Sequence, residues 1–112
     1  MSLEQQRAKF AWEKAKASPN DFTSLAKGAP ALIMGNGLMA ALAFWNSRKT
    51  EQGNHLVTAL LGWLKERRLV TSDEFNAAMN EIVQFNSDTY MQATNEALDF
   101  LKWLRQLAAT QG

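Results

Sequence analysis

The strongest constraint on the fold is an apolar segment at residues 29–45, which contains no charged side chain. Pro30 fits the first turn of a helix because its ring fixes φ and it has no amide hydrogen to lose. The triplet Gly-Asn-Gly at 35–37 tolerates positive φ and predicts a tight corner between two helices. We therefore expect a short helix at 30–34 and a second helix at about 37–48. Because apolar residues lie on nearly every side of the second helix, it is predicted to occupy the middle of a bundle.

Length and composition limit the possible classes of protein. A chain of 112 residues suits one domain, here residues 1–112, with a single core. Hydrophobic residues make up 46% and charged residues 21%, which is typical of a globular chain. The absence of cysteine excludes disulfides and thiolate chemistry and fits a reducing compartment. No apolar run has the length of a membrane span, and the first residues lack a signal-peptide core, so we expect a cytoplasmic protein without a membrane partner.

Charge is distributed unevenly along the chain, although the net charge is only +1. Residues 1–49 carry seven basic and three acidic side chains, a net charge of +4. Residues 50–112 carry five basic and eight acidic ones, a net charge of −3. Such asymmetry indicates either a polyanion bound at one face or copies of the chain that stack head to tail.

Helical periodicity covers most of the remaining sequence, and no segment shows the period-two pattern of a strand. Residues 47–54 are polar and predicted to form a mobile loop, and His55 is predicted to face solvent. A capping box from Thr71 to Glu74 is expected to begin a further helix. The predicted helices are 3–17, a short one from about 22 to 27, 54–67, one following the capping box, and 89–109. The fold class is therefore all-α, a compact single-domain bundle of about five to six helices.

Residues suited to catalysis or metal binding are few. A single histidine and no cysteine leave too few ligands for a usual transition-metal site. The carboxylates of Asp73, Glu74 and Glu81 are able in principle to bind Mg²⁺ or to act as acid and base, but their spacing is more typical of a solvated helix start. We predict no catalytic residue, no metal, no cofactor and no small-molecule substrate.

Basic side chains flank the apolar corner, and no acidic residue lies between positions 21 and 51. Lys27 precedes the corner, Arg48 and Lys49 follow it, and Lys14 and Lys16 are expected to join them at one edge of the bundle. Two interpretations remain open for these cations. They either contact the phosphates of RNA or DNA, independently of sequence and weakened by salt, or complement the dipoles of helix C-termini.

Trp103 breaks the amphipathic pattern of the last predicted helix, since it lies among polar positions such as Lys102. Its ring either packs against a neighbouring segment, contacts another protein or stacks on a base. The pattern does not separate these roles.

Two blocks of sequence together carry a resemblance to a known family. The first comprises Pro-Ala-Leu-Ile at 30–33, Asn-Gly-Leu at 36–38 and Ala-Leu-Ala-Phe at 41–44. The second comprises Tyr90, Ala-Thr at 93–94, Glu-Ala-Leu at 96–98 and Phe-Leu-Lys-Trp-Leu-Arg at 100–105. With Trp-Leu at 63–64 between them, these blocks resemble the signature of the small helical subunit of Cmr-type (type III-B) CRISPR RNA-guided effector complexes. The resemblance covers essentially the whole chain.

The resemblance implies an all-α subunit without catalytic activity, of which several copies form a minor filament beside the backbone subunits that hold the guide RNA. Target cleavage is assigned to those backbone subunits. The implied partners are other Cmr subunits, copies of this chain, and guide and target RNA. The alternative is a helical adaptor that contacts protein only. The candidate phosphate contacts are Lys27, Arg48, Lys49, Arg105 and Lys14, and the candidate protein contacts are Trp103 and Lys102.

Overall fold

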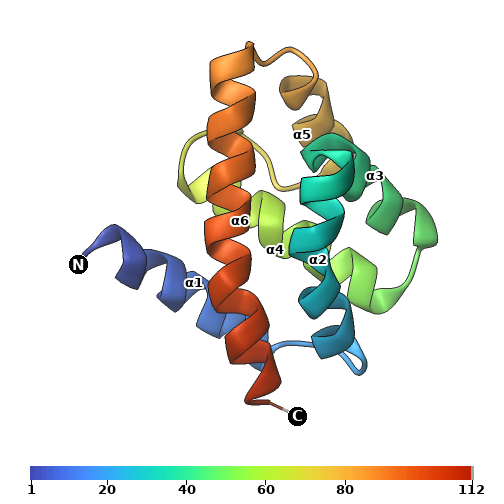
Figure 1. Cartoon of the computed structure of the whole chain (residues 1–112), viewed down its shortest axis with the longest axis vertical. Helices are drawn as coiled ribbons and strands as arrows, with labels where there is room; N and C mark the ends of the chain where they lie inside the picture. Colours follow the sequence, from blue (N-terminus) through green and yellow to red (C-terminus); the bar gives the residue numbers. More distant parts are fainter. Residues whose placement is uncertain (112) are drawn as a thin grey trace.

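The computed structural model describes residues 1–111, which form six helices and no strand. The predicted all-α class and the number of helices are confirmed. In Figure 1, α6 runs the height of the molecule, with α1 on one side, α2 and α3 on the other, and α4 crossing between them. Within residues 1–111, no helix combines the length and the apolar character that crossing a membrane requires. The helices are α1 (Leu3–Lys16), α2 (Phe22–Asn36), α3 (Leu38–Arg48), α4 (Glu51–Glu66), α5 (Phe75–Ile82) and α6 (Ser87–Ala109).

Helix α4 forms the centre of the bundle, because it contacts each of the other five helices. Its buried residues lie around most of its circumference: Gly53, Leu56, Val57, Ala59, Leu60, Leu61, Gly62, Trp63 and Leu64. Helix α6 is the second main packing surface and contacts α1, α2 and α4. The prediction that the apolar helix after the corner is central is therefore wrong. That helix, α3, buries one side and leaves Phe44 48% exposed on the other.

Helix α2 is continuous, although Gly28 and Pro30 lie within it. The prediction of a helix ending at 27–28 and a second short piece at 30–34 is wrong. Phe22, Ala26 and Ile33, together with Ala29, are buried at helical spacing along one face, and α2 packs closely along α6. Burial of this stripe outweighs the local cost of glycine and proline inside a helix.

The predicted corner between helices is confirmed. Gly37 alone takes the positive φ, at 93°, while its amide donates to the carbonyl oxygen of Ile33 at 2.7 Å and so ends α2. The amide of Met39 in the first turn of α3 donates to the hydroxyl oxygen of Tyr90, a residue of α6, at 3.0 Å. The long last helix therefore fixes where α3 begins.

The start of α5 differs from the predicted capping box. Glu74 is itself the N-cap, and its carboxylate accepts hydrogen bonds from the amides of Asn76 and Ala77. Thr71 turns away and donates both its amide and its hydroxyl to the carboxylate of Glu81. Of the three carboxylates considered for acid–base chemistry, Glu74 therefore lies at the helix start as the structural interpretation expected, whereas Glu81 binds Thr71 from the last turn of α5.

The polar segment 47–54 is mostly helical, so the predicted loop is wrong except at Lys49 and Thr50. Helix α3 ends at Arg48, Lys49 adopts a left-handed conformation with φ 54°, and the hydroxyl of Thr50 accepts from the amide of Gly53 to begin α4.

His55 is half-buried, so the prediction that it faces solvent is wrong. Its Nε2 lies 2.8 Å from the carbonyl oxygen of Lys14, and its ring meets Phe22 edge-on at a centroid distance of 4.8 Å.

Candidate nucleic-acid interface

The corner between α3 and α4 presents two of the predicted cations. Arg48 ends α3 and Lys49 forms its C-cap, and both side chains are exposed. The guanidinium of Arg48 lies 5.6 Å from the ring centroid of Phe44, within the range of a cation–π contact. An exposed aromatic ring and two exposed cations therefore share this corner.

A groove with a volume of about 450 Å³ separates this corner from the first turns of α2. Its lining combines apolar and polar side chains from both sides: Asp21, Ser24, Leu25, Phe44, Trp45, Arg48, Thr50, Gln52 and Gly53. Lys27 is exposed on α2, three residues after Ser24 in the groove lining. The fold therefore brings Arg48 to the beginning of α2, the helix that carries Lys27.

Lys14 belongs to a different groove, of about 440 Å³, between α1 and the end of α4. Lys65 and Arg68 line this groove with it, and Glu66 and Asp73 supply opposite charge. Lys14 and Arg48, expected at one edge of the bundle, line different grooves, and Lys16 lies 5.5 Å from the ring of Trp12 on α1. Sequence reasoning missed Lys65 and Arg68. The signal that could have found them is the run Lys65-Glu66-Arg67-Arg68, the densest cluster of basic residues in the chain.

The three candidates on α6 differ in exposure. Lys102 is exposed and Arg105 is half-buried. Trp103 is half-buried and packs against the hydrophobic core, which favours the packing interpretation for part of its ring. The rest of the Trp103 side chain is exposed, and its contact with another protein stays a prediction.

Glu96 forms a buried charge cluster that sequence reasoning missed. Its carboxylate accepts two hydrogen bonds from Arg7, at 2.8 and 3.2 Å, and one from the indole N–H of Trp63 at 2.9 Å. The Nε atom of Arg67 lies 3.5 Å from the same carboxylate. The cluster joins α6 to α1, α4 and the residue that follows α4. The available signal was an acidic residue on the same helical face as Ala93, Ala97 and Phe100.

The pKa of the Glu96 carboxyl lies below its ordinary value. Burial raises this pKa, but hydrogen bonds from Arg7 and Trp63 and the charges of Arg7 and Arg67 together lower it more. The carboxylate is therefore ionised near neutral pH and holds helices together, and it lines neither the groove that carries Arg48 nor the one that carries Lys14.

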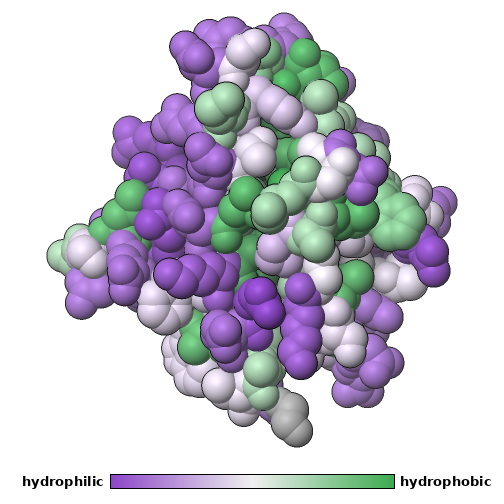
Figure 2. Space-filling view, in the orientation of Figure 1, coloured by the Kyte–Doolittle hydropathy of each residue, from purple (hydrophilic) through white to green (hydrophobic). Residues whose placement is uncertain are grey.

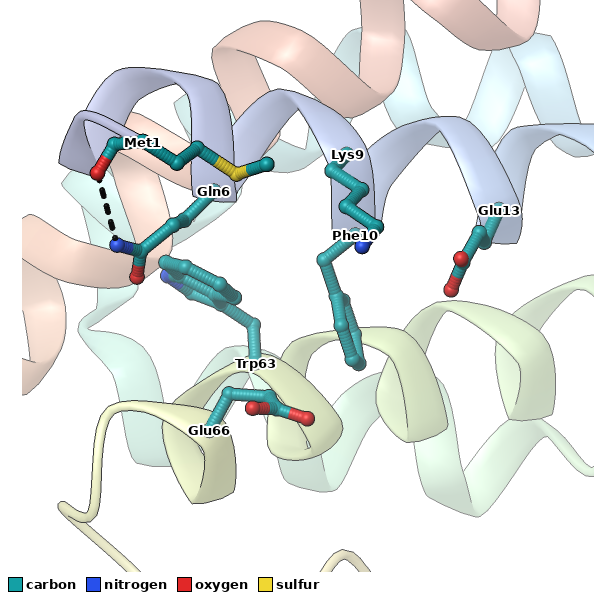
Figure 3. Close-up of a pocket in the computed structure, with 7 residues that line it drawn as sticks. All are labelled: Met1, Gln6, Lys9, Phe10, Glu13, Trp63 and Glu66. Carbon is teal, nitrogen blue, oxygen red and sulfur yellow. Dashed lines mark hydrogen bonds between the residues drawn. The ribbon is translucent and has the colours of Figure 1, made fainter.

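A third groove lies between α1 and α4 (Figure 3) and has a volume of about 300 Å³. Phe10 points from α1 towards α4, and Trp63 points back towards α1, so aromatic rings form its floor. Lys9, Glu13 and Glu66 surround the rings with charges of both signs. Among residues 1–111, no group of three or more histidine, aspartate and glutamate side chains lies close enough to hold a metal ion.

The surface is not uniform in hydropathy. Figure 2 shows hydrophobic and weakly polar side chains gathered over α2 and α3, whereas hydrophilic ones dominate over the flank of α6 that faces α1. Met34 in α2 is 75% exposed and Phe44 in α3 is 48% exposed. The protein is thus a small helical bundle, and its grooves and exposed apolar side chains are surfaces suited to contacts with larger partners.

The comparison with protein families identifies the chain. Residues 3–111 match the family described as CRISPR-associated protein (Cas_Cmr5). The chain therefore belongs to this family, the small subunit of type III-B CRISPR complexes, and it is a CRISPR-associated Cmr subunit that assembles with other Cas subunits. Comparisons with curated proteins and with solved structures gave no significant match.

Proposed function

We propose that this chain is a non-catalytic small subunit of a type III-B effector complex, which forms the minor filament with copies of itself and supports guide and target RNA through phosphate contacts. The family match over residues 3–111 carries the proposal. The exposed cations at Lys27, Arg48 and Lys49 support it, because exposed lysine and arginine contact phosphates without reading sequence. Base pairing between guide and target then supplies recognition, as in other RNA-guided effectors.

The cationic corner is the preferred phosphate surface, and Lys14 and Arg105 are secondary candidates. Arg48 and Lys49 are adjacent and exposed where α3 turns into α4. Arg105 is half-buried. Lys14 is half-buried, whereas Arg48 and Lys49 are exposed, and the carboxylates of Glu66 and Asp73 partly offset the positive charge that Lys14, Lys65 and Arg68 give to its groove.

Charge reversal tests this function in the assembled complex. We expect K27E/K49E to weaken retention of target RNA and to flatten its salt dependence, because each lost phosphate contact lowers the salt slope by about 0.7 to 0.9. The measurement is the apparent Kd of target RNA for the reconstituted complex at several salt concentrations. K9E/K16E, which changes the net charge equally on the exposed side of α1, is the matched control.

The adaptor that contacts protein only is the competing function, and the exposed apolar residues Met34 and Phe44 favour it. Photocrosslinking separates the two. A subunit that lines the RNA channel crosslinks to target RNA within the complex, whereas a pure adaptor crosslinks only to neighbouring subunits. Unchanged RNA retention by K27E/K49E together with an absence of RNA crosslinks would contradict the proposed function.

A further inference from the structure

The groove between α2 and the α3–α4 corner has the size of a site for a small ligand group. Its volume of about 450 Å³ lies within the range of small-molecule sites, roughly 300 to 1,000 Å³. Leu25 and the buried Trp45 provide apolar wall, and Gly53 brings the backbones of α3 and α4 close together behind it. The groove is therefore bounded by rigid helical elements.

Phe44 offers a flat stacking surface at the mouth of this groove. Phe44 is 48% exposed, although the same helix buries Leu42 and Trp45 completely or nearly so. The guanidinium of Arg48, one turn later, lies 5.6 Å from the ring centroid. Unpaired bases are recognised by stacking on aromatic rings and on arginine planes, and here the guanidinium of Arg48 lies over the ring of Phe44.

Charge in the groove is polarised. Arg48 makes the α3 side positive, with Lys49 next to it in the chain, whereas Asp21 lines the α2 side. The carboxylate of Asp21 makes no hydrogen bond to cap α2, so it is available to accept from a ligand. Ser24 and Gln52 add a hydroxyl and an amide to the lining. A phosphate is attracted to the arginine end and repelled from the aspartate end, whereas the amino and imino groups of a base edge suit the aspartate end.

We propose that this groove binds one unpaired nucleotide of single-stranded RNA, with the base stacked on Phe44 and the phosphate at Arg48. The inference rests on the proposed function, since it assigns a position to RNA on the subunit. An aromatic ring, a cation above it and a free carboxylate opposite match a nucleotide in both shape and charge. An apolar side chain of a protein partner would leave Arg48 and Asp21 without complementary groups.

Binding of a fluorescein-labelled single-stranded hexanucleotide RNA to the full purified chain, followed by anisotropy at several salt concentrations, tests the site. We expect F44L to weaken binding by about tenfold with an unchanged salt slope, because stacking on an aromatic ring is lost while charge is retained. R48Q is expected to weaken binding and to lower the salt slope by about 0.7, the value for one phosphate of a single strand.

Trp12 provides the matched control. It is 41% exposed and carries Lys16 at 5.5 Å from its ring, so it repeats the aromatic–cation pair outside the lining of this groove. W12L is expected to bind the hexanucleotide within about twofold of the wild type, because the lost ring is not at the site. Circular dichroism melting of both variants confirms that each is folded.

Three results would overturn the inference. These are equal affinities of F44L and W12L, no measurable binding of the hexanucleotide by the wild-type chain, or failure of F44L to join the other Cmr subunits while its RNA affinity is unchanged. The last result would make the groove a protein-docking site. None of these results decides the proposed function, which is measured separately on the assembled complex through Lys27 and Lys49.

Discussion

Helices α3 and α4 follow one another in the chain and pack together. The more apolar of the two, α3, is the less buried. Helix α3 belongs to the most apolar segment of the chain and leaves Ala40, Ala43 and Phe44 exposed. Helix α4 contains Gln, Asn, His, Thr and two glycines, and it is buried on nearly every side. Hydropathy alone therefore does not decide which helix is central.

Small residues explain the central position of α4. A Cβ atom at Gly53 would lie 2.9 Å from the backbone oxygen of Trp45, and one at Gly62 would lie 3.1 Å from the ring of Phe10. Because these two positions lack side chains, α3 and α1 approach α4 on sides where a larger residue would hold them away. The face of α4 that carries Ala59 and Gly62 thus becomes a packing surface.

The exposed side of α3, unlike the faces of α4, is not used for packing within the bundle. Neighbouring helices α2, α4 and α5 cover one side of it, and no element of residues 1–111 covers Phe44 fully. An aromatic side chain that the bundle leaves uncovered is available to a partner, and Arg48 lies next to it. The contrast between the two helices therefore separates the residues that stabilise the fold from those that are available for binding.

The largest expected effect tests this contrast directly. Leu60 is fully buried in α4, and L60A is expected to lower the free energy of unfolding by about 3 kcal/mol through lost burial and a cavity. F44A is expected to lower it by only about 0.5 kcal/mol, chiefly through the contact with Arg48. Urea denaturation of both variants measures the difference. Equal losses would show that α3 is as important to the core as α4.

A second prediction concerns the close approach of α3 and α4. G53A is expected to destabilise the chain by about 2 kcal/mol, because the new methyl group meets backbone atoms of Trp45 that yield only if the helices separate. Gly35 is the control, since a Cβ atom there meets nothing within 4 Å. G35A is expected to be neutral or to stabilise by about 0.5 kcal/mol. A melting temperature for G53A at or above that of the wild type would contradict the packing argument.

The smallest expected effect concerns the charge cluster that joins α4 to α1 and α6. E96Q is expected to cost about 1.5 kcal/mol near neutral pH, because charge-assisted hydrogen bonds from Arg7 become neutral ones. D99N is the control: Asp99 is 57% exposed and lies 3.5 Å from Arg7, so its loss is expected to cost less than about 0.5 kcal/mol.

The same cluster predicts a pH dependence. The pKa of Glu96 is lower in the folded chain than its ordinary value of 4.5, so the unfolded chain takes up the proton first as the pH falls. The contribution of Glu96 is therefore complete above about pH 4.5 and is lost as the pH falls through the folded pKa. Urea midpoints across this acidic range should fall more steeply for the wild type than for E96Q. Parallel curves would exclude Glu96 as a source of the acid sensitivity.

The sequence by itself determined the helical class, the corner at Gly37 and, to within two residues at each end, the bounds of the first and last helices. These features depend on local chemistry: helix formers without interruption, a residue that accepts positive φ, and Asn86 capping α6 by accepting from the amide of Thr89. The same local rules marked Lys27, Arg48 and Lys49 as exposed cations near the corner, and their exposure is observed.

Only the tertiary structure decided which helix is central, that α2 runs through Pro30, and that His55 and Glu96 are covered. Each of these depends on contacts between residues far apart in the chain, such as Glu96 with Arg7 or Gly62 with Phe10. Periodicity within one helix identifies a face that is able to pack, but the neighbours decide how many faces do so. For the same reason, the grooves that separate Lys14 from Arg48 exist only after the helices have assembled.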